Sequence, residues 1–242
     1  MKIKLSEVKN CLETVLHINT AGMTSTQMVN ILKSFLLDSK KRGNVYIGAM
    51  NLRGKRAEKP ENTISVNVTS AQATNSMDRR DFSPMTEIVG GYKGYWNFES
   101  YWQSGKVFEG IPDQTAKKWW KDNKEAKRRY PNSKGKKVLY AQWEENPEKM
   151  DYVTSRKKIY IPEYFELMKV REATCKWRKE VDNGKDIMIY DFDGPRDKDG
   201  NPICLKVTPE MMRTQINDPR FPFGHGYIIA AWLANIRPEE YV

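Results

Sequence analysis

The sequence predicts an α+β, helix-rich single domain with a small sheet, preceded by an N-terminal helical extension. Several segments repeat apolar residues at the spacing of a buried helical face. Other short segments alternate β-branched and aromatic residues, as strands do. The 242 residues, 39% of them hydrophobic, are enough to bury one full core. We place the extension at residues 1–43 and the main domain at residues 44–242.

The first two predicted helices form the extension, and a small sheet begins after them. Residues 5–17 and 25–41 have helical patterns, and a basic end followed by Gly43 closes the second helix. Residues 44–50 and 63–68 are flanked by turn-rich segments and are predicted to be strands. We expect the N-terminal helix pair to be scaffold.

The remaining elements follow from the positions of proline and from turn residues. Proline suits the first turn of a helix, and the residue before a later proline tends to leave the helix. An Asp-rich turn after residue 196 lacks the Gly and Glu that a calcium loop requires at fixed positions. The predicted order is an irregular loop over 69–85, a helix from Pro112 to before Pro131, a helix over 162–179, two strands over 187–194 and 203–208 joined by a turn, and a buried helix over 227–236.

Composition limits the classes of protein to which the chain can belong. No apolar run reaches the roughly 18 residues that cross a bilayer, and Glu7 and Glu13 interrupt the N-terminus where a signal peptide is apolar. We therefore expect a cytoplasmic protein without a membrane partner. Cys11, Cys175 and Cys204 are widely spaced and lack a CxxC or His neighbour. They are predicted to be buried free thiols, and neither a metal nor another cofactor is expected.

One segment carries nearly all of the positive charge. Residues 117–137 contain ten Lys or Arg and two acidic residues, in a chain of formal net charge +10. Such a concentrated field attracts polyanions. Trp119, Trp120 and Tyr130 within it can stack on bases or pack inward, and the alternative to a nucleic-acid surface is a solvated helix face over a core. The candidate phosphate ligands are Lys117, Lys118, Lys121, Lys124, Lys127, Arg128 and Arg129.

A polar triplet stands out in the aromatic segment 94–108. On a helix, Glu99, Gln103 and Lys106 lie at i, i+4 and i+7 and share one face, with Trp102 on its flank. If the surrounding aromatic residues bury this helix, the three polar groups must face a cleft or pair with one another. The alternative is an exposed helix with a Glu–Lys surface pair.

These residues resemble the signature helix of the NADAR superfamily. An aromatic residue, then Glu-x-x-x-Gln-x-x-Lys and Phe108, is similar to the family pattern, although Ser100 stands where the family usually has His. The segment 82–85 (FSPM) resembles the family's Ser-Asn-Phe or Ser-Pro-Phe loop. Trp143, Met150 and Arg156 stand where the family has a Trp, an Arg and a Met before a helix. The resemblance extends over roughly residues 82 to 233, and it implies substrate-binding roles for Ser83 and Arg156.

Members of that superfamily are N-glycosidases, and this reaction suits the residues present. The resemblance implies hydrolysis of a bond between ribose and nitrogen, in riboflavin-pathway intermediates or in ADP-ribosylated guanine on DNA. Such a reaction passes through an oxocarbenium-like state that carboxylates stabilise. We assign catalysis to Glu99 and to Asp193, which lies at the end of a predicted strand, although plain turn chemistry also explains Asp193. Substrate binding is assigned to Ser83, Trp102, Gln103, Lys106, Arg156 and His225, the last with a structural role as its alternative.

The basic segment selects the substrate class. A nucleic-acid strand needs such a charged surface, whereas a small metabolite does not. We therefore expect an N-glycosidase that acts on a modified or ADP-ribosylated base in DNA. The alternatives are a hydrolase of small nucleotides or riboflavin-pathway intermediates, a non-enzymatic nucleic-acid binding module, and, more weakly, a metal-dependent nuclease built on Glu99, Asp191 and Asp193.

Overall fold

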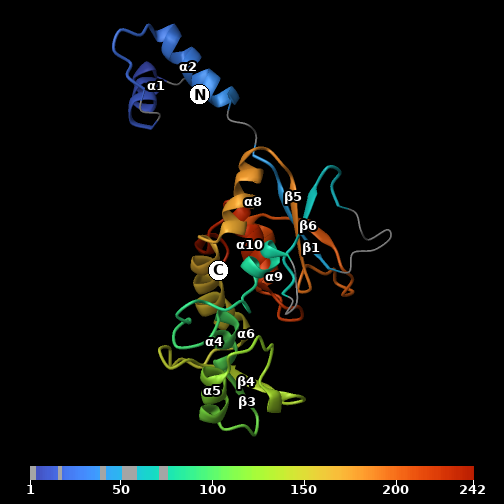
Figure 1. The fold of residues 1–242 in the computed structure, drawn as a ribbon. Coiled ribbons are helices and arrows are strands. Elements are labelled where there is room, and N and C mark those ends of the chain that lie inside the picture. Colours follow the sequence, from blue (N-terminus) through green and yellow to red (C-terminus); the bar gives the residue numbers. More distant parts are fainter. Residues whose placement is uncertain (1–3, 16–17, 39–41, 51–58, 71–75) are drawn as a thin grey trace.

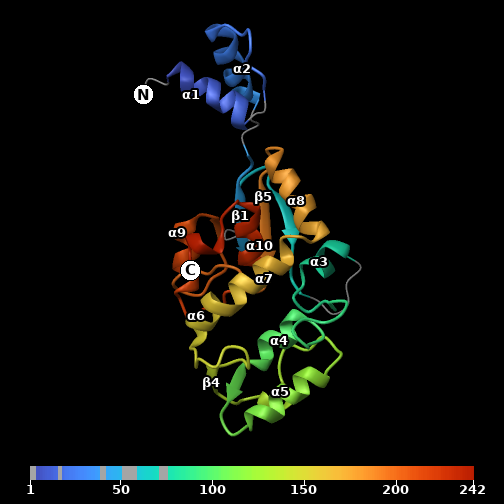
Figure 2. The same cartoon turned by 90° about the vertical axis from the view of Figure 1, so that its left-hand side faces the viewer.

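The protein is a mixed α and β structure in which helices outnumber strands. The structure, a computed structural model, describes residues 4–15, 18–38, 42–50, 59–70 and 76–242. In Figures 1 and 2 a sheet with helices beside it occupies the middle of the molecule, and a second part with α4, α5, β3 and β4 lies below it. The predicted helix-rich mixed fold with a small sheet is confirmed.

The N-terminal residues form a small helical unit. It contains α1 (Leu5–Asn10), a π-helical turn (Cys11–Val15) and α2 (Ser25–Asp38). Both views place these helices at one end of the molecule, away from the sheet. The last residues of both predicted helices lie outside the described residues. Their small apolar cluster is centred on Val8, Leu12 and Met28.

The main sheet has four strands in the order β2 (Ile64–Asn67), β5 (Ile187–Asp191), β1 (Val45–Ala49) and β6 (Cys204–Lys206). The strands β1 and β2 both run parallel to β5, and β6 runs antiparallel to β1. Apolar β-branched side chains on the central strands are fully buried, as expected for a covered sheet. The turn after β5 does not make a hairpin with β6, because β1 lies between these two strands.

Helices cover the sheet and connect its parallel strands. The almost entirely buried α10 (His225–Leu233) packs on β1, β5, α7 (Ile161–Met168) and α8 (Glu172–Asp182). The single helix expected over 162–179 is therefore two helices, separated at residues 169–171. The loop expected over 69–85 contains a short helix. The other helices of this part are α3 (Met77–Phe82), α9 (Pro209–Ile216) and a 3-10 turn (Pro238–Glu240).

The lower part begins with a short capped helix. The helix α4 (Phe98–Ser104) starts at Asn97, whose side chain accepts a hydrogen bond from Ser100 N at 2.7 Å. It ends at Gly105, where a Cβ atom would lie 2.1 Å from the ring of Trp143. The i, i+7 spacing predicted that Lys106 lies on this helix, and that prediction was wrong. Lys106 begins the next strand. The elements that follow are β3 (Lys106–Phe108), α5 (Asp113–Asp122), a 3-10 turn (Pro131–Ser133), β4 (Val138–Ala141), α6 (Tyr152–Ser155) and a π-helix (Arg156–Tyr160).

The basic segment is only partly helical. The helix α5 ends at Asp122, eight residues before the position that Pro131 predicted, and residues 123–130 form an irregular loop. The side chains of Trp120 and Tyr130 are buried, and Trp119 packs edge-on against both. These aromatic rings thus belong to the core, which is the inward alternative.

Two further expectations concern membranes and thiols. Within the described ranges no helix is both long and apolar enough to cross a bilayer. All three cysteines are free thiols, as expected. The expectation that they are buried was wrong, because Cys175 is exposed on α8 and Cys11 and Cys204 are half-buried.

Candidate active site

One cavity collects side chains from distant parts of the chain. It has a volume of about 180 Å³, close to the ~150 Å³ of a protein cavity known to hold benzene, so it can admit one ring-sized group. It lies beyond the carboxyl ends of the parallel strands β2 and β5, where open α/β sheets bind ligands. The predicted site residues on its wall are Glu99, Trp102, Gln103, Arg156, Asp193 and His225.

The helix α4 supplies a carboxylate that is held in place. Gln103 Nε2 donates to Glu99 Oε1 at 2.6 Å, and both residues line the cavity. No hydrogen bond from the described residues reaches the second carboxylate oxygen of Glu99. The helix therefore orients one carboxylate and leaves an oxygen for a ligand or water.

Lys106 lies in the same electrostatic environment despite its place on β3. Burial lowers the pKa of Lys106 to about 8, while the nearby Glu99 carboxylate favours the charged form and the Arg156 guanidinium opposes it. Its ammonium lies 6.0 Å from the centre of the Trp102 ring. Lys106 does not line the cavity and forms no ion pair with Glu99, so the structure brings only Glu99 and Gln103 of the predicted triplet together on the wall.

Arg156 occupies an aromatic cage beside the cavity. Its guanidinium carbon lies 4.3 Å from the ring centre of Tyr160, 4.9 Å from that of Trp102 and 5.1 Å from that of Tyr152. Trp102 in turn stacks on Trp143 at 5.2 Å. Arg156 is 8% exposed, and its Nε atom is buried without a hydrogen-bond partner. This guanidinium is thus fixed in position but unpaired.

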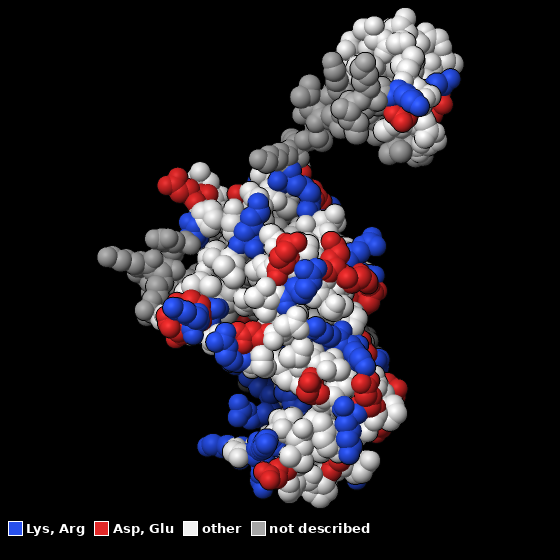
Figure 3. All heavy atoms as spheres, turned by 180° about the vertical axis from the view of Figure 1, so that it is seen from behind, with Lys and Arg blue, Asp and Glu red and all other residues white. Residues whose placement is uncertain are grey.

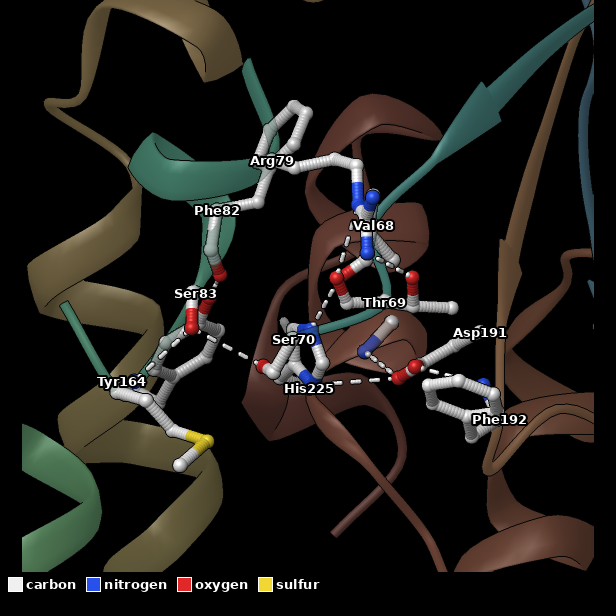
Figure 4. Close-up of polar contacts among 12 residues, drawn as sticks. Val68, Thr69, Ser70, Arg79, Phe82, Ser83, Tyr164, Asp191, Phe192 and His225 are labelled. Atoms are coloured by element: carbon white, nitrogen blue, oxygen red, sulfur yellow. Dashed lines mark hydrogen bonds and ion pairs between the residues drawn. The ribbon is translucent and has the colours of Figure 1, made fainter. Parts of the chain in front are cut away.

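The opposite wall joins the end of β5 to the start of α10. The Asp191 carboxylate is 3% exposed and accepts hydrogen bonds from Phe192 N at 2.7 Å and from Gly226 N at 3.3 Å. Its Oδ2 atom lies 3.1 Å from His225 Nδ1 (Figure 4). A Cβ on Gly226 would approach Asp191 within 2.8 Å, so glycine allows this close approach.

Both ring nitrogens of His225 are engaged within the protein. Its Nε2 atom lies 2.6 Å from the carbonyl oxygen of Val68, the residue after β2 (Figure 4). A carbonyl oxygen only accepts, so Nε2 carries a hydrogen, and a proton must also lie between Nδ1 and Asp191. His225 thus ties β2, β5 and α10 together, and this geometry favours its structural role over anion binding.

The loop with Ser83 forms a buried support for the cavity. Ser83 Oγ donates to Ser70 Oγ at 3.1 Å and accepts a hydrogen bond from Met85 N at 3.1 Å. The hydroxyl of Tyr164 donates to the carbonyl oxygen of Phe82 (Figure 4). The cavity is lined by Pro84, Met85 and Ser70 but not by Ser83. Ser83 therefore holds the loop and does not face the cavity.

The basic segment reaches the cavity through a single residue. Arg128 Nη2 donates to the Ser70 carbonyl oxygen at 2.7 Å, and its guanidinium lies 5.7 Å from the Phe192 ring centre. Arg128 and Phe192 both line the cavity. The residue expected to bind a phosphate strand thus bridges the two loops that follow β2 and β5.

The other predicted phosphate ligands divide into two groups. Acidic neighbours pair with Lys117, Lys121 and Lys127 at 2.8, 3.0 and 2.7 Å, and Lys117 is buried. The side chains of Lys118, Lys124 and Arg129 are exposed. Figure 3 shows Lys and Arg side chains gathered at the lower left of that view, beside a hollow in the surface. A smaller basic surface than the sequence predicted is therefore available.

No family model, curated protein or solved structure matches the chain. In the part of the chain that the structure describes, no three His, Cys, Asp or Glu side chains come together as a metal site would require.

The sequence analysis assigned no substrate-site role to several residues of the cavity wall, although it named Asp191 in the nuclease alternative. Asp191 and Phe192 come directly before Asp193, and a strand-end Asp-x-Asp followed by a separate Gly-His-Gly is the signal that could have revealed the Asp191–His225 pair. Tyr160 and Ser70 also line the cavity, but their positions depend on packing and carry no local signal.

Proposed function

We propose that the protein is an N-glycosidase that hydrolyses the bond between a ribose and a modified or ADP-ribosylated base in DNA. The observation that carries the proposal is the cavity that brings Glu99 together with Asp193, which are 94 positions apart, beside Arg156 and several aromatic rings. A ring-sized cavity suits one base or one ribose, with the rest of the substrate outside.

The cavity residues have roles that match this reaction. As the N-glycosidic bond breaks, positive charge develops on the sugar, and the Glu99 carboxylate stabilises it. Gln103 fixes the orientation of that carboxylate through the 2.6 Å hydrogen bond. Asp193 is half-buried on the opposite wall and orients the attacking water. The Trp102 and Tyr160 rings provide apolar surface for the sugar or the base.

DNA as the substrate is supported by exposed basic side chains in the segment that supplies one residue of the cavity wall. Lys118, Lys124 and Arg129 belong to the segment that also places Arg128 on the cavity wall. A phosphate backbone that follows these side chains would bring one flipped nucleotide to the cavity. The proposal includes a NADAR-like architecture for residues 44–242 and an N-terminal extension over residues 1–43.

A second candidate is a hydrolase of small nucleotides or riboflavin-pathway intermediates. Lys117, Lys121 and Lys127 are paired with acidic neighbours, which leaves less charge for a nucleic-acid strand. The two candidates differ in substrate but share the reaction.

Turnover of matched substrates separates them. The full chain is incubated with DNA containing ADP-ribosylated guanine and, separately, with the corresponding free nucleotide adduct, at low and at high salt. The proposal predicts faster cleavage of the DNA substrate and a strong loss of rate with salt. Equal or faster cleavage of the free adduct, without salt dependence, would assign the protein to the second candidate.

A further inference from the structure

We propose that Arg156 forms a phosphate subsite, so that the group entering the cavity is a phosphorylated ribosyl group. The inference rests on the proposed function for the role of the sugar, but the subsite itself is argued from the charge and burial of the cavity residues. It names the part of the substrate that the cavity recognises.

The first argument is that the Arg156 charge is buried without a counter-charge. The residue is 8% exposed, its Nε atom lacks a partner, and no hydrogen bond or ion pair from the described residues engages its guanidinium. A buried unpaired charge is costly, and contact with aromatic rings offsets only part of that cost. An anionic ligand would supply the missing partner.

The second argument is that none of the three carboxylates on the cavity wall, those of Glu99, Asp191 and Asp193, forms an ion pair with Arg156. Glu99 accepts the Gln103 hydrogen bond, and Asp191 interacts with two backbone amides and His225. The Asp193 carboxylate accepts no hydrogen bond from the described residues, yet it is not paired with Arg156 either. A bound anion would supply the direct counter-charge that these side chains do not.

The third argument concerns the number of cations nearby. Beside burial, the positive charges of Arg156 and Arg129 disfavour the charged form of Lys106, while the carboxylates of Glu99 and Asp193 favour it. A phosphate bound to Arg156 would offset the repulsion between Arg156 and Lys106, whereas a neutral sugar would not. Arginine is also suited to phosphate, since its planar fork donates two parallel hydrogen bonds.

The fourth argument is geometric. Three aromatic rings surround the guanidinium at 4.3 to 5.1 Å and hold it in one position. The cavity of about 180 Å³ has room for a single ring beside it. A phosphate on Arg156 would therefore position its ribose against the Glu99–Gln103 pair, which lines the same cavity.

Direct binding tests the subsite without any turnover. Calorimetry on the full chain compares ribose 5-phosphate with ribose, and a dinucleoside 3′,5′-phosphate with its two nucleosides. Each phosphorylated ligand that binds at least about tenfold more tightly than its unphosphorylated counterpart supports the subsite, because charge-assisted hydrogen bonds contribute about 1.5–3 kcal/mol. If ribose 5-phosphate shows the larger increase in affinity, the subsite binds a phosphate monoester. If the dinucleoside phosphate shows it, the subsite binds a DNA phosphodiester.

Variants assign the effect to Arg156. Arg156→Gln should lose about tenfold or more in affinity for ribose 5-phosphate, Arg156→Lys should retain part of it, and Arg220→Gln, on an exposed residue outside the cavity, should bind as the wild type does. If Arg156→Gln does not fold, the subsite is tested by the affinities of the wild type for phosphorylated and unphosphorylated ligands and by the affinity of Arg156→Lys for ribose 5-phosphate.

The subsite is wrong if phosphorylated and unphosphorylated ligands bind equally to the wild type, or if folded Arg156→Gln binds ribose 5-phosphate with unchanged affinity. A protein that binds the phosphorylated ligands but cleaves no N-glycosidic bond would keep the subsite and overturn the proposed function.

Discussion

Replacing Asp191 with Asn tests the pair that joins the end of β5 to the start of α10. Asparagine can keep the hydrogen bond from Phe192 N, but its NH₂ group must then face Gly226 N and His225, where the carboxylate now accepts. The variant loses the buried Asp191–His225 interaction at a residue that is 3% exposed, and it leaves the Gly226 N–H unpaired. We expect a loss of about 3–5 kcal/mol, the usual range for breaking one partner of a buried pair.

Urea and thermal unfolding measure this loss. At roughly 2–4 °C per kcal/mol for a chain of this size, the melting temperature should fall by roughly 6–20 °C. Asp193→Asn is the matched control, since this carboxylate is half-buried two residues further on and no described residue hydrogen-bonds to it. Its unfolding free energy should change by less than about 1 kcal/mol.

A double-mutant cycle with His225→Gln isolates the interaction. Removing either partner should remove most of the same stabilising interaction, so the coupling should be about 1–3 kcal/mol. Additive losses within about 0.5 kcal/mol, or an Asp191→Asn variant as stable as the Asp193→Asn control, would refute the pairing described for this wall.

Three further predictions concern the charge of Lys106, the basic surface and the need for a metal ion. The folded-state pKa of Lys106 is about 8 and its ordinary value is 10.5. Above pH 8 the folded protein therefore binds fewer protons than the unfolded chain does. The unfolding free energy should therefore rise between about pH 8 and 9.5 in the wild type and rise less in Lys106→Met; equal slopes in urea titrations would contradict this. Reversing Lys118, Lys124 and Arg129 to Glu should lower DNA affinity at least about tenfold and reduce the salt slope by roughly two to three, as fluorescence anisotropy at several salt concentrations would show; an unchanged slope would exclude this surface. EDTA should leave turnover unchanged, since the proposed chemistry uses carboxylates only; loss of activity restored by a divalent ion would favour the nuclease alternative.

Charge reversal needs a matched control for net charge alone. The same number of reversals at Lys179, Lys198 and Arg220, which are exposed outside the basic segment, changes the total charge equally. DNA affinity should fall much less in this control than in the variant of the basic segment.

Elements with a strong local pattern were predictable from the sequence. The β1 and β2 strands and the buried α10 alternate or concentrate apolar residues in ways that packing then satisfies. The Glu99–Gln103 pair was predictable because i, i+4 neighbours meet on any helix. These features depend on residues close together in the chain.

Features that depend on distant packing were not predictable. The helix α4 ends at Gly105 because the Trp143 ring lies against that residue, and no pattern near residue 105 announces it. The position of β1 between β5 and β6 likewise depends on how all four strands of the sheet pair. The helix α5 ends at Asp122, well before Pro131, and we have no physical account of this early end. Arg128 lines the cavity because its loop folds back onto Ser70.

The most direct test of the proposed reaction is mass spectrometry of what the protein releases from DNA that carries ADP-ribosylated guanine or another modified base. The wild type should release a base or ADP-ribose while the phosphodiester backbone stays intact. Glu99→Gln should fold normally and turn over at least about 10²-fold more slowly, because it loses the charge that stabilises the oxocarbenium-like state. Backbone cleavage before any base is released, or a Glu99→Gln rate within about threefold of the wild type, would contradict the glycosidase assignment.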